Sequence, residues 1–400
     1  MKLYRFSDNL PIMHFGSEIQ VEVPDKYVEK PLRGLWISNV LNIDLPTVEN
    51  IELYQKKVME MFDACVSSNI NAVFFQVRTT NDAFYESELN PYSRYFTGKE
   101  GRRPPFDVLK WIINAAKERN IEFHAWCNPY RVSPNGNLSV EEYLDTCDKL
   151  NFAKRHPEYL VLDKQGKMIL NPAIKEVKQF IIDSMVEIVE NYDVDGIHFD
   201  DYFYPYSGLD DNHSDLEQFS RQNLELGDFR RENVNEVIKG VYEAIKKVNP
   251  ILKFGVSPFG IWKNHKDGIY GSHTDPACSE SYYGQYADTL AWIKGGYIDY
   301  VVPQIYWEFG HKIAPFADIC DFWAEVCKDS PVKLYIGHGA YRLGNEGEFS
   351  NPKEVVNQVK YANNYPQVQG NIFFTYHTFI DKGKTEPGII ELRKLLNGAA

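Results

Sequence analysis

The sequence "NYDVDGIHFDDYFYPY" at residues 191–206 contains one strand signal and the polar, aromatic loop that comes after it. Its centre, Gly196 to Phe199, is short and apolar and is bounded by aspartates, which is typical of a buried strand. Apolar residues at helical spacing precede it at 175–192 and follow it at 229–249. The segment therefore predicts a helix–strand–loop–helix unit with two adjacent carboxylates, Asp200 and Asp201, where the strand ends.

Seven other stretches of the chain show the same strand signal, and helix-period segments alternate with them. The eight predicted strands are residues 32–38, 71–78, 121–128, 195–201, 252–258, 299–307, 332–339 and 370–377. The predicted helices are residues 47–69, 106–120, 175–192, 229–249, 285–294, 314–328, 352–364 and 388–396. Strict alternation repeated eight times predicts an α/β fold, the (β/α)8 TIM barrel. A doubly wound sheet is the alternative, but it usually has fewer strands, and no glycine-rich phosphate loop follows any strand in this sequence.

The long connections of the chain follow strands rather than helices. Residues 79–105, 129–173, 202–228 and 259–284 each form such a connection. In a TIM barrel these loops build the C-terminal face, where barrel enzymes keep their active sites. No break in composition marks a second domain, so we expect a single catalytic barrel domain over residues 31–400, with residues 1–30 as an N-terminal extension that packs on it.

The bulk composition excludes several classes of partner. The chain has 400 residues, 44% of them apolar, and a formal net charge of −13. Nucleic acids and anionic membranes bind clustered Lys and Arg, so an acidic chain argues against both. Aromatic residues make up 14% of the sequence. Core packing accounts for most of them, but Tyr and Trp also offer flat faces on which sugar rings stack.

Targeting and cofactor signals are weak. No apolar run approaches the roughly 20 residues that cross a bilayer. The N-terminal sequence "MKLYRFSDNLPIMHFG" lacks the apolar core of a signal peptide, which predicts a cytoplasmic location. A chain whose signal had been removed would look the same and would be extracytoplasmic or a lipoprotein. The six cysteines are scattered without a CxxC pair, which suits reduced thiols, and we predict neither a metal site nor a cofactor.

Strand parity predicts which side chains face the barrel axis, because neighbouring residues of a strand point to opposite faces. In the fourth strand, Ile197 and Phe199 suit the helix layer, which places His198 and Asp200 on the axis side. The same argument gives further axial sets in the second, third and sixth strands: Gln76 and Arg78; Glu122, His124, Trp126 and Asn128; and Val302, Gln304, Tyr306 and Glu308. Polar side chains from four strands are thus expected to converge at the C-terminal face.

Two carboxylates in a groove walled by Tyr and Trp match the needs of glycoside hydrolysis. One protonates the leaving oxygen while positive charge builds at the anomeric carbon. A separation of about 5–5.5 Å implies a covalent intermediate and about 6.5–9.5 Å an inverting water, and a third route uses the acetamido group of the substrate. We predict Asp200, Glu308 and Asp201 as the catalytic residues.

The fourth and sixth strands also resemble family 18 chitinases, which use the acetamido route. "DGIHFDD" is similar to their DGxDxDxE pattern, and "PQIYW" to their QxY pattern. His198 replaces the middle Asp of the first pattern, and Tyr202 stands where those chitinases have their acid. The resemblance implies that Asp200 orients the acetamido group and that Tyr306 donates a hydrogen bond to it. The acid must then come from elsewhere, with Glu308 as first choice and Asp201 as second.

A resemblance over nearly the whole chain is carried by seven motifs in order. They are "LRGLWIS" at 32–38, "FFQVRTTNDAFYESELNPYSRYFTG" at 74–98, "FHAWCNPYRV" at 123–132, "DVDGIHFDDYFYP" at 193–205, "FGVSPFGIW" at 254–262, "DYVVPQIYW" at 299–307 and "YIGHGAYR" at 335–342. With these motifs the chain resembles the glycosyl-hydrolase-like family 10 proteins, the DUF187 group. The resemblance implies a (β/α)8 fold and a glycosidase of a bacterial glycan containing N-acetylhexosamine, with peptide-free peptidoglycan strands as the substrate class. Members usually carry an export or lipoprotein signal.

Residues at strand ends and in these motifs are predicted to bind the oligo- or polysaccharide. They are Trp36, Arg78, Asp82, His124, Trp126, Asn128, Tyr130, Tyr202, Gln304, Tyr306, Trp307 and Tyr376. Purely structural roles are an alternative for several of them, since His124 can be a satisfied core group and Arg78 can neutralise a neighbouring carboxylate. Three other functions stay open: a non-catalytic glycan-binding barrel, a hydrolase of an alpha-glucan or other polysaccharide, and a metal-dependent hydrolase.

Overall fold

The computed structural model describes residues 1–48, 50–221, 223–266 and 268–398. Parts of several predictions fall outside these residues: position 49 of the first predicted helix, positions 222 and 267 of two long loops, and the last two residues of the predicted barrel domain. Of the helices in the described ranges, none is long and apolar enough to cross a bilayer.

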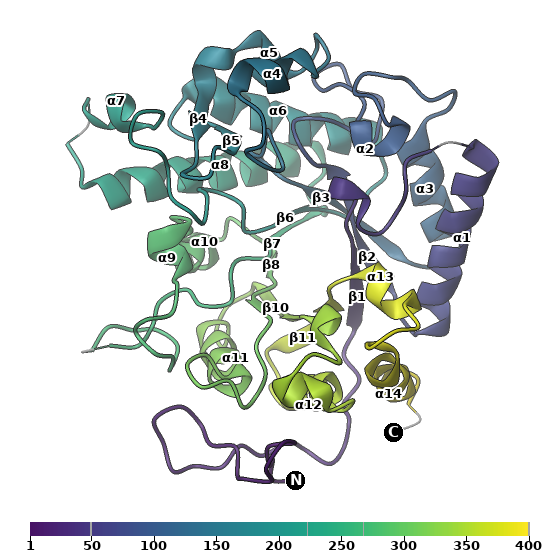
Figure 1. The fold of residues 1–400 in the computed structure, drawn as a ribbon, viewed down its shortest axis with the longest axis vertical. Coiled ribbons are helices and arrows are strands. Elements are labelled where there is room, and N and C mark those ends of the chain that lie inside the picture. Colours follow the sequence, from purple (N-terminus) through teal and green to yellow (C-terminus); the bar gives the residue numbers. More distant parts are fainter. Residues whose placement is uncertain (49, 222, 267, 399–400) are drawn as a thin grey trace.

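The predicted TIM barrel is confirmed: parallel strands form a closed ring with helices around it (Figure 1). The strands are β1 (Leu32–Ile37), β2 (Ala72–Arg78), β3 (Glu122–Cys127), β6 (Gly196–Phe199), β7 (Lys253–Val256), β8 (Tyr300–Val301), β9 (Gln304–Ile305), β10 (Lys333–His338) and β11 (Val368–Phe373). Neighbouring strands of the ring pair in parallel, β8 and β9 both pair with β10, and β11 closes the ring on β1 with Leu32 opposite Gly370. β8 and β9 are one barrel strand, interrupted at Val302 and Pro303, because proline has no N–H for the ladder.

Helices follow the strands as the sequence predicts, and short helices decorate the loops. The α-helices are α1 (Ile51–Ser67), α2 (Arg94–Thr97), α3 (Val108–Lys117), α4 (Val140–Asp145), α5 (Phe152–Arg155), α6 (Lys175–Asn191), α7 (Leu216–Phe219), α8 (Leu226–Val248), α9 (Ser281–Gly284), α10 (Thr289–Gly295), α11 (Phe316–Val326), α12 (Glu354–Asn363), α13 (Tyr376–Ile380) and α14 (Glu386–Leu396). The 3-10 helices are η1 (Val40–Asn42), η2 (Pro157–Tyr159), η3 (Ala340–Arg342) and η4 (Gly347–Ser350). A hairpin of β4 (Leu160–Leu162) and β5 (Met168–Leu170) lies in the loop after β3.

The barrel has two apolar cores, and strand parity separates them. The larger core lies between the strands and the helix layer, and it contains Ile197 and Phe199 as predicted. The smaller core fills the barrel interior with rings from alternate positions, among them Phe74 and Tyr300. These rings fit because neighbouring strands carry glycines: a Cβ at Gly255 would lie 2.2 Å from the Tyr300 ring. The rings close the lower part of the barrel and leave its C-terminal mouth to the functional side chains.

The N-terminal extension forms short antiparallel bridges within residues 1–23, such as Met13 to Gln20. In Figure 1 the extension lies below α11 and α12. The backbone N–H of Phe6 donates to Glu348 at 2.8 Å, and that of Phe15 donates to Asp318 at 3.1 Å. The extension is thus tied to the barrel, whereas the division into residues 1–30 and 31–400 stays a prediction.

Candidate active site

A cavity of about 440 Å³ opens at the C-terminal ends of the strands, which we call the central pocket. Aromatic rings, polar groups and two carboxylates surround it. It is lined by Trp36, Ser38, Val40, Ile43, Trp126, Arg131, Asp200, Asp201, Tyr202, Tyr206, Ser257, Phe259, Gln304, Tyr306, Trp307, Tyr341, Arg342 and Phe374. Its volume and its mixture of apolar walls with a few polar groups are typical of small-molecule sites.

Both aspartates of the opening motif reach this pocket because β6 ends at Phe199. In a continuing strand, two neighbouring side chains would point to opposite faces. Beyond the strand end that restriction is lifted, so Asp200 and Asp201 share one wall of the pocket. They are 3% and 5% exposed, which makes them accessible to a ligand and largely withdrawn from water.

Asp200 is held by three hydrogen-bond donors. Trp126 Nε1 donates to its Oδ2 at 3.2 Å, the backbone N–H of Tyr202 donates to its Oδ1 at 3.2 Å, and the amide of Asn128 donates to Oδ2 as well. The Asn128 amide is itself fixed, because Gln76 Nε2 donates to Asn128 Oδ1 at 2.6 Å. Side chains from β2 and the end of β3 thus position the carboxylate at the end of β6.

Asp201 has a different environment, although it is the next residue. The Tyr206 hydroxyl donates to its carboxylate, and the ring of Tyr206 is packed edge-on to Tyr202 at 5.8 Å. Both tyrosines are partly exposed, at 44% for Tyr202 and 47% for Tyr206, so their faces border the opening of the pocket. Arg131 stacks over Tyr202 with its guanidinium carbon 4.3 Å from the ring centroid.

Burial sets the protonation of the pair. It raises the pKa of Asp200, while the Arg131 charge and the donors to this carboxylate oppose that rise. Burial and the nearby Asp200 charge raise the pKa of Asp201 to about 8. Two adjacent carboxyls in a low-dielectric site do not ionise together. With a pKa of about 8, Asp201 is suited to act as an acid at neutral pH, and the hydrogen-bond donors and the Arg131 charge make Asp200 the member of the pair that ionises more readily.

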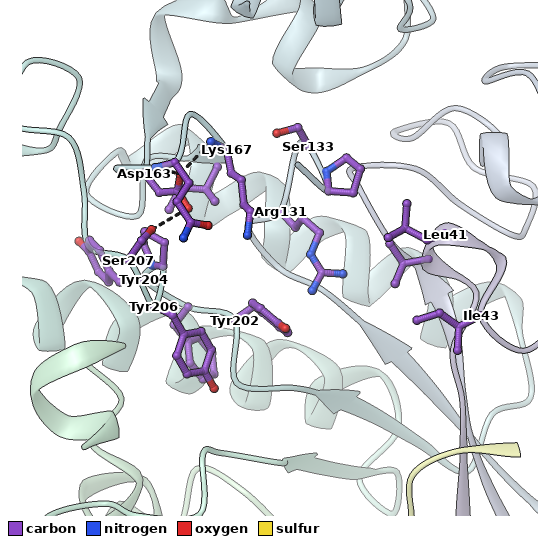
Figure 2. A pocket seen from close by; sticks show the side chains of 16 residues that line it. Leu41, Ile43, Arg131, Ser133, Asp163, Lys167, Tyr202, Tyr204, Tyr206 and Ser207 are labelled. Carbon is purple, nitrogen blue, oxygen red and sulfur yellow. Dashed lines mark hydrogen bonds between the residues drawn. The ribbon is translucent and has the colours of Figure 1, made fainter. Parts of the chain in front are cut away.

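A second cavity of about 430 Å³, the adjoining pocket, continues from the central pocket (Figure 2). The two cavities share five lining residues: Val40, Ile43, Arg131, Tyr202 and Tyr206. Figure 2 shows Arg131 and Lys167 above Tyr202 and Tyr206, with Leu41 and Ile43 at the side. Because they share these residues, the two pockets form one continuous groove.

The structure brings together eight of the residues predicted for catalysis or binding. Trp36, Trp126, Asp200, Asp201, Tyr202, Gln304, Tyr306 and Trp307 all line the central pocket. The Gln304 amide donates to the carbonyl oxygen of Ser257 at 2.8 Å, which links two strand ends on the pocket wall. Their roles toward a substrate stay a prediction.

Glu308 departs from its predicted orientation. It does not line the central pocket, and its carboxylate accepts a hydrogen bond from the backbone N–H of Glu348 at 2.9 Å, at the start of η4. The parity argument fails because β9 ends at Ile305, so Tyr306 to Glu308 lie beyond the regular strand. The prediction that Asp200 and Glu308 face a common hollow is wrong, and Asp201 takes the place beside Asp200.

Arg78 is also turned away from the axis. The pairing of β2 with β3 shifts register between Gln76 and Arg78. Gln76 pairs with Trp126, and Arg78 pairs with Cys127, whereas a regular ladder would pair Arg78 with Asn128. One extra residue in a strand reverses the direction of the side chains beyond it. Arg78 is fully buried on the helix side, where its guanidinium lies 5.4 Å from the ring of Phe180.

Five other predicted binding residues lie outside both pockets. Asp82 is buried in the turn after β2 and accepts from the Thr79 backbone N–H at 2.7 Å. His124 lies in the barrel interior, stacked on Phe74 at 4.5 Å. Asn128 donates a hydrogen bond to Asp200 and does not line the pocket itself. Tyr130 and Tyr376 pack in the core on the helix side; β11 ends at Phe373, and Tyr376 begins α13.

Several pocket residues were missed from the sequence. They are Arg131, Ser257, Phe259, Tyr341, Arg342 and Phe374. Most lie on loops after strands, where parity gives no direction. Arg131 stands in the motif "FHAWCNPYRV" at the end of the third strand, so its place in that motif was an available signal.

Comparisons with known proteins agree with this architecture. A family model described as Glycosyl hydrolase-like 10 matches residues 31–353. Glycosyl hydrolase YngK of Bacillus subtilis is 37% identical over 355 residues, which cover 87% of this chain and 68% of YngK. Glycosyl hydrolase DigH of Escherichia coli K12 is 32% identical over 386 residues, which cover 91% of this chain and 87% of DigH. The glycoside hydrolase domain of PgaB (BpsB) from Bordetella bronchiseptica shares the fold, with a TM-score of 0.55 at 12% identity over 92% of this chain and 99% of that one.

Proposed function

The chain belongs to the glycosyl hydrolase-like 10 family, as its motifs indicated, and on that premise we propose that it is a glycosidase of a bacterial glycan containing N-acetylhexosamine. Peptide-free peptidoglycan strands are the proposed substrate class. The observation that carries this proposal is the pair of unlike carboxyls, with Asp201 as an acid and Asp200 as a carboxylate, inside an aromatic groove.

The placement of the pair favours one route over another. An inverting enzyme needs its two carboxyls on opposite faces of the sugar ring, with room for a water. Asp200 and Asp201 leave the same strand end and share one wall. This arrangement supports the route in which the substrate's own acetamido group is the nucleophile.

In that route each residue has a defined task. Asp201 gives its proton to the glycosidic oxygen as the C1–O bond breaks, and the acetamido oxygen forms the new bond to C1. Asp200 accepts the acetamido N–H and stabilises its growing positive charge. The Tyr306 hydroxyl, which borders the pocket, donates to the acetamido oxygen. Water then attacks C1, the bond between C1 and the acetamido oxygen breaks, and the water gives a proton to Asp201, so the acetamido group is restored and the configuration at C1 is retained.

The test is a hydrolysis assay with peptide-free peptidoglycan strands and with chitin oligomers, in which mass spectrometry detects new reducing ends. We expect products from at least one of these N-acetylhexosamine polymers and loss of products in the Asp201→Asn variant. Binding of both polymers without turnover at any pH would instead identify a glycan-binding barrel and overturn the proposal.

A further inference from the structure

The adjoining pocket contains two cations that no carboxylate of the described residues neutralises. Arg131 and Lys167 both line it. Within the described residues, neither the Arg131 guanidinium nor the Lys167 ammonium forms a hydrogen bond or an ion pair, although Arg131 rests on the Tyr202 ring. A guanidinium carries five N–H donors and an ammonium three, so this pocket presents an unusual number of open donors.

Other cations of this chain have structural roles, and these cations form ion pairs with carboxylates. Arg230 donates to both carboxylate oxygens of Asp215, at 2.7 Å for the closest pair, and Arg94 pairs with Glu100 at 2.6 Å. In such a pair the cation already has its carboxylate partner within the protein. Among the described residues no carboxylate forms such an ion pair with Arg131 or Lys167, and the carboxylate that lines the adjoining pocket with them is already engaged.

That nearby carboxylate is Asp163, which lines the same pocket. Its Oδ1 accepts from the backbone N–H groups of Gln165 and Lys167, both at 2.8 Å, and its Oδ2 accepts from the Ser207 hydroxyl at 2.8 Å. Asp163 therefore stabilises the turn between β4 and β5, and the Lys167 side chain is left to extend into the pocket (Figure 2).

The two cations differ in their relation to the aspartate pair. Arg131 borders both pockets, and its charge lowers the pKa of Asp200 and of Asp201, against the larger effect of burial. Lys167 lines the adjoining pocket and is not among the residues that line the central pocket with the two aspartates. Substitution of Lys167, rather than of Arg131, therefore tests what the adjoining pocket binds.

We propose that the adjoining pocket binds a carboxylate-bearing sugar next to the sugar whose bond is cleaved, with Lys167 and Arg131 pairing with that carboxylate. The inference rests on the proposed function and deepens it, since it makes the substrate an acidic glycan. A chain of net charge −13 repels such a polymer at long range, so local open cations are what would admit it. The carboxylate could belong to a lactyl ether or to a uronic acid, which share this chemistry.

The experiment measures binding to the full chain carrying Asp201→Asn, so that turnover does not consume the probes. The probes are a tetrasaccharide of alternating N-acetylglucosamine and N-acetylmuramic acid, a tetrasaccharide of alternating N-acetylglucosamine and glucuronic acid, and the methyl amide of each. We expect one acid form to bind about tenfold more tightly than its amide at low salt. The tetrasaccharide that shows the preference identifies the source of the carboxylate.

Adding Lys167→Met should reduce that preference to about threefold or less. The matched control is Lys164→Met, which removes the same charge from an exposed position of the same turn, outside the pocket lining, and should keep the full preference. Equal affinity for acid and amide forms, or a preference that Lys167→Met leaves intact, overturns the inference. Hydrolysis of the amide probes by the unaltered chain is scored separately: cleavage without an acid preference keeps the proposed function and rejects the acidic subsite.

Discussion

Two clusters of carboxylates lie at the C-terminal mouth of this barrel, and they differ in what binds them. The aspartate pair, Asp200 and Asp201, faces the central pocket and is held by side chains such as Trp126 and Tyr206. The glutamate cluster, defined as Glu308, Glu348 and Glu354, accepts hydrogen bonds from backbone N–H groups of Glu348, Phe6 and Phe309. The first cluster can meet a ligand, whereas the second fastens loops and the N-terminal extension.

Each cluster contains a carboxyl group whose pKa is raised, so a raised pKa does not by itself identify the active site. Burial raises the pKa of Glu354 to about 7, just as it raises the pKa of Asp201. Structural networks and catalytic sites perturb pKa values in the same way. What distinguishes Asp201 is that its carboxyl borders an open, aromatic pocket next to a second carboxylate that is separately stabilised.

The largest expected effect comes from exchanging one carboxylate in each cluster for an amide. Asp200→Asn should lower kcat by about 10²–10⁴-fold, because the site loses the charge that stabilises the transition state. Glu308→Gln should leave kcat within about twofold, since the amide oxygen still accepts from the Glu348 N–H. Steady-state kinetics on one glycan checks both variants, and thermal unfolding controls for misfolding. A loss in Glu308→Gln equal to that in Asp200→Asn would return Glu308 to the catalytic pair.

The second prediction concerns pH. Asp201 must be protonated to act as the acid, so kcat/KM should fall about tenfold per unit as pH rises above about 8. In Asp200→Asn the repulsion that helps raise the pKa of Asp201 is gone, and the residual activity should fall at a lower pH. A pH profile of each variant checks this shift. A falling limb that keeps its position in Asp200→Asn would show that the two carboxyls are not coupled.

The smallest effect on turnover is expected in the glutamate cluster, where the change appears in stability. The folded protein favours protonated Glu354, with a pKa raised from 4.5 to about 7, so the contribution of Glu354 to stability is fully present below pH 4.5 and is lost as the pH rises toward 7. The loss amounts to at most about 3 kcal/mol. Glu354→Gln should remove this decrease in stability with rising pH, while kcat changes by less than about twofold.

Urea unfolding at pH 5 and at pH 8 measures the difference, with Glu346→Gln as the matched control because Glu346 is exposed in the loop before η4. A Glu354→Gln variant with the same pH dependence as the unaltered protein would contradict the role of its burial.

The sequence by itself determined the α/β class and predicted the barrel, because eight apolar strand signals alternate with helical ones. It also determined that His198 faces the barrel axis, since parity holds throughout β6. Within a regular strand, local geometry fixes the direction of every side chain.

Only the tertiary structure decided where side chains point once regular strand geometry ends. The bulge in β2 turned Arg78 outward, the early end of β9 released Glu308 to η4, and the turn held by Asp163 directed Lys167 into the adjoining pocket. These directions depend on contacts between residues far apart in the chain, or on a change of register between two strands. No periodicity in the sequence encodes such contacts, which is why the groove and its two aspartates could be expected at the barrel mouth but the position of Lys167 could not.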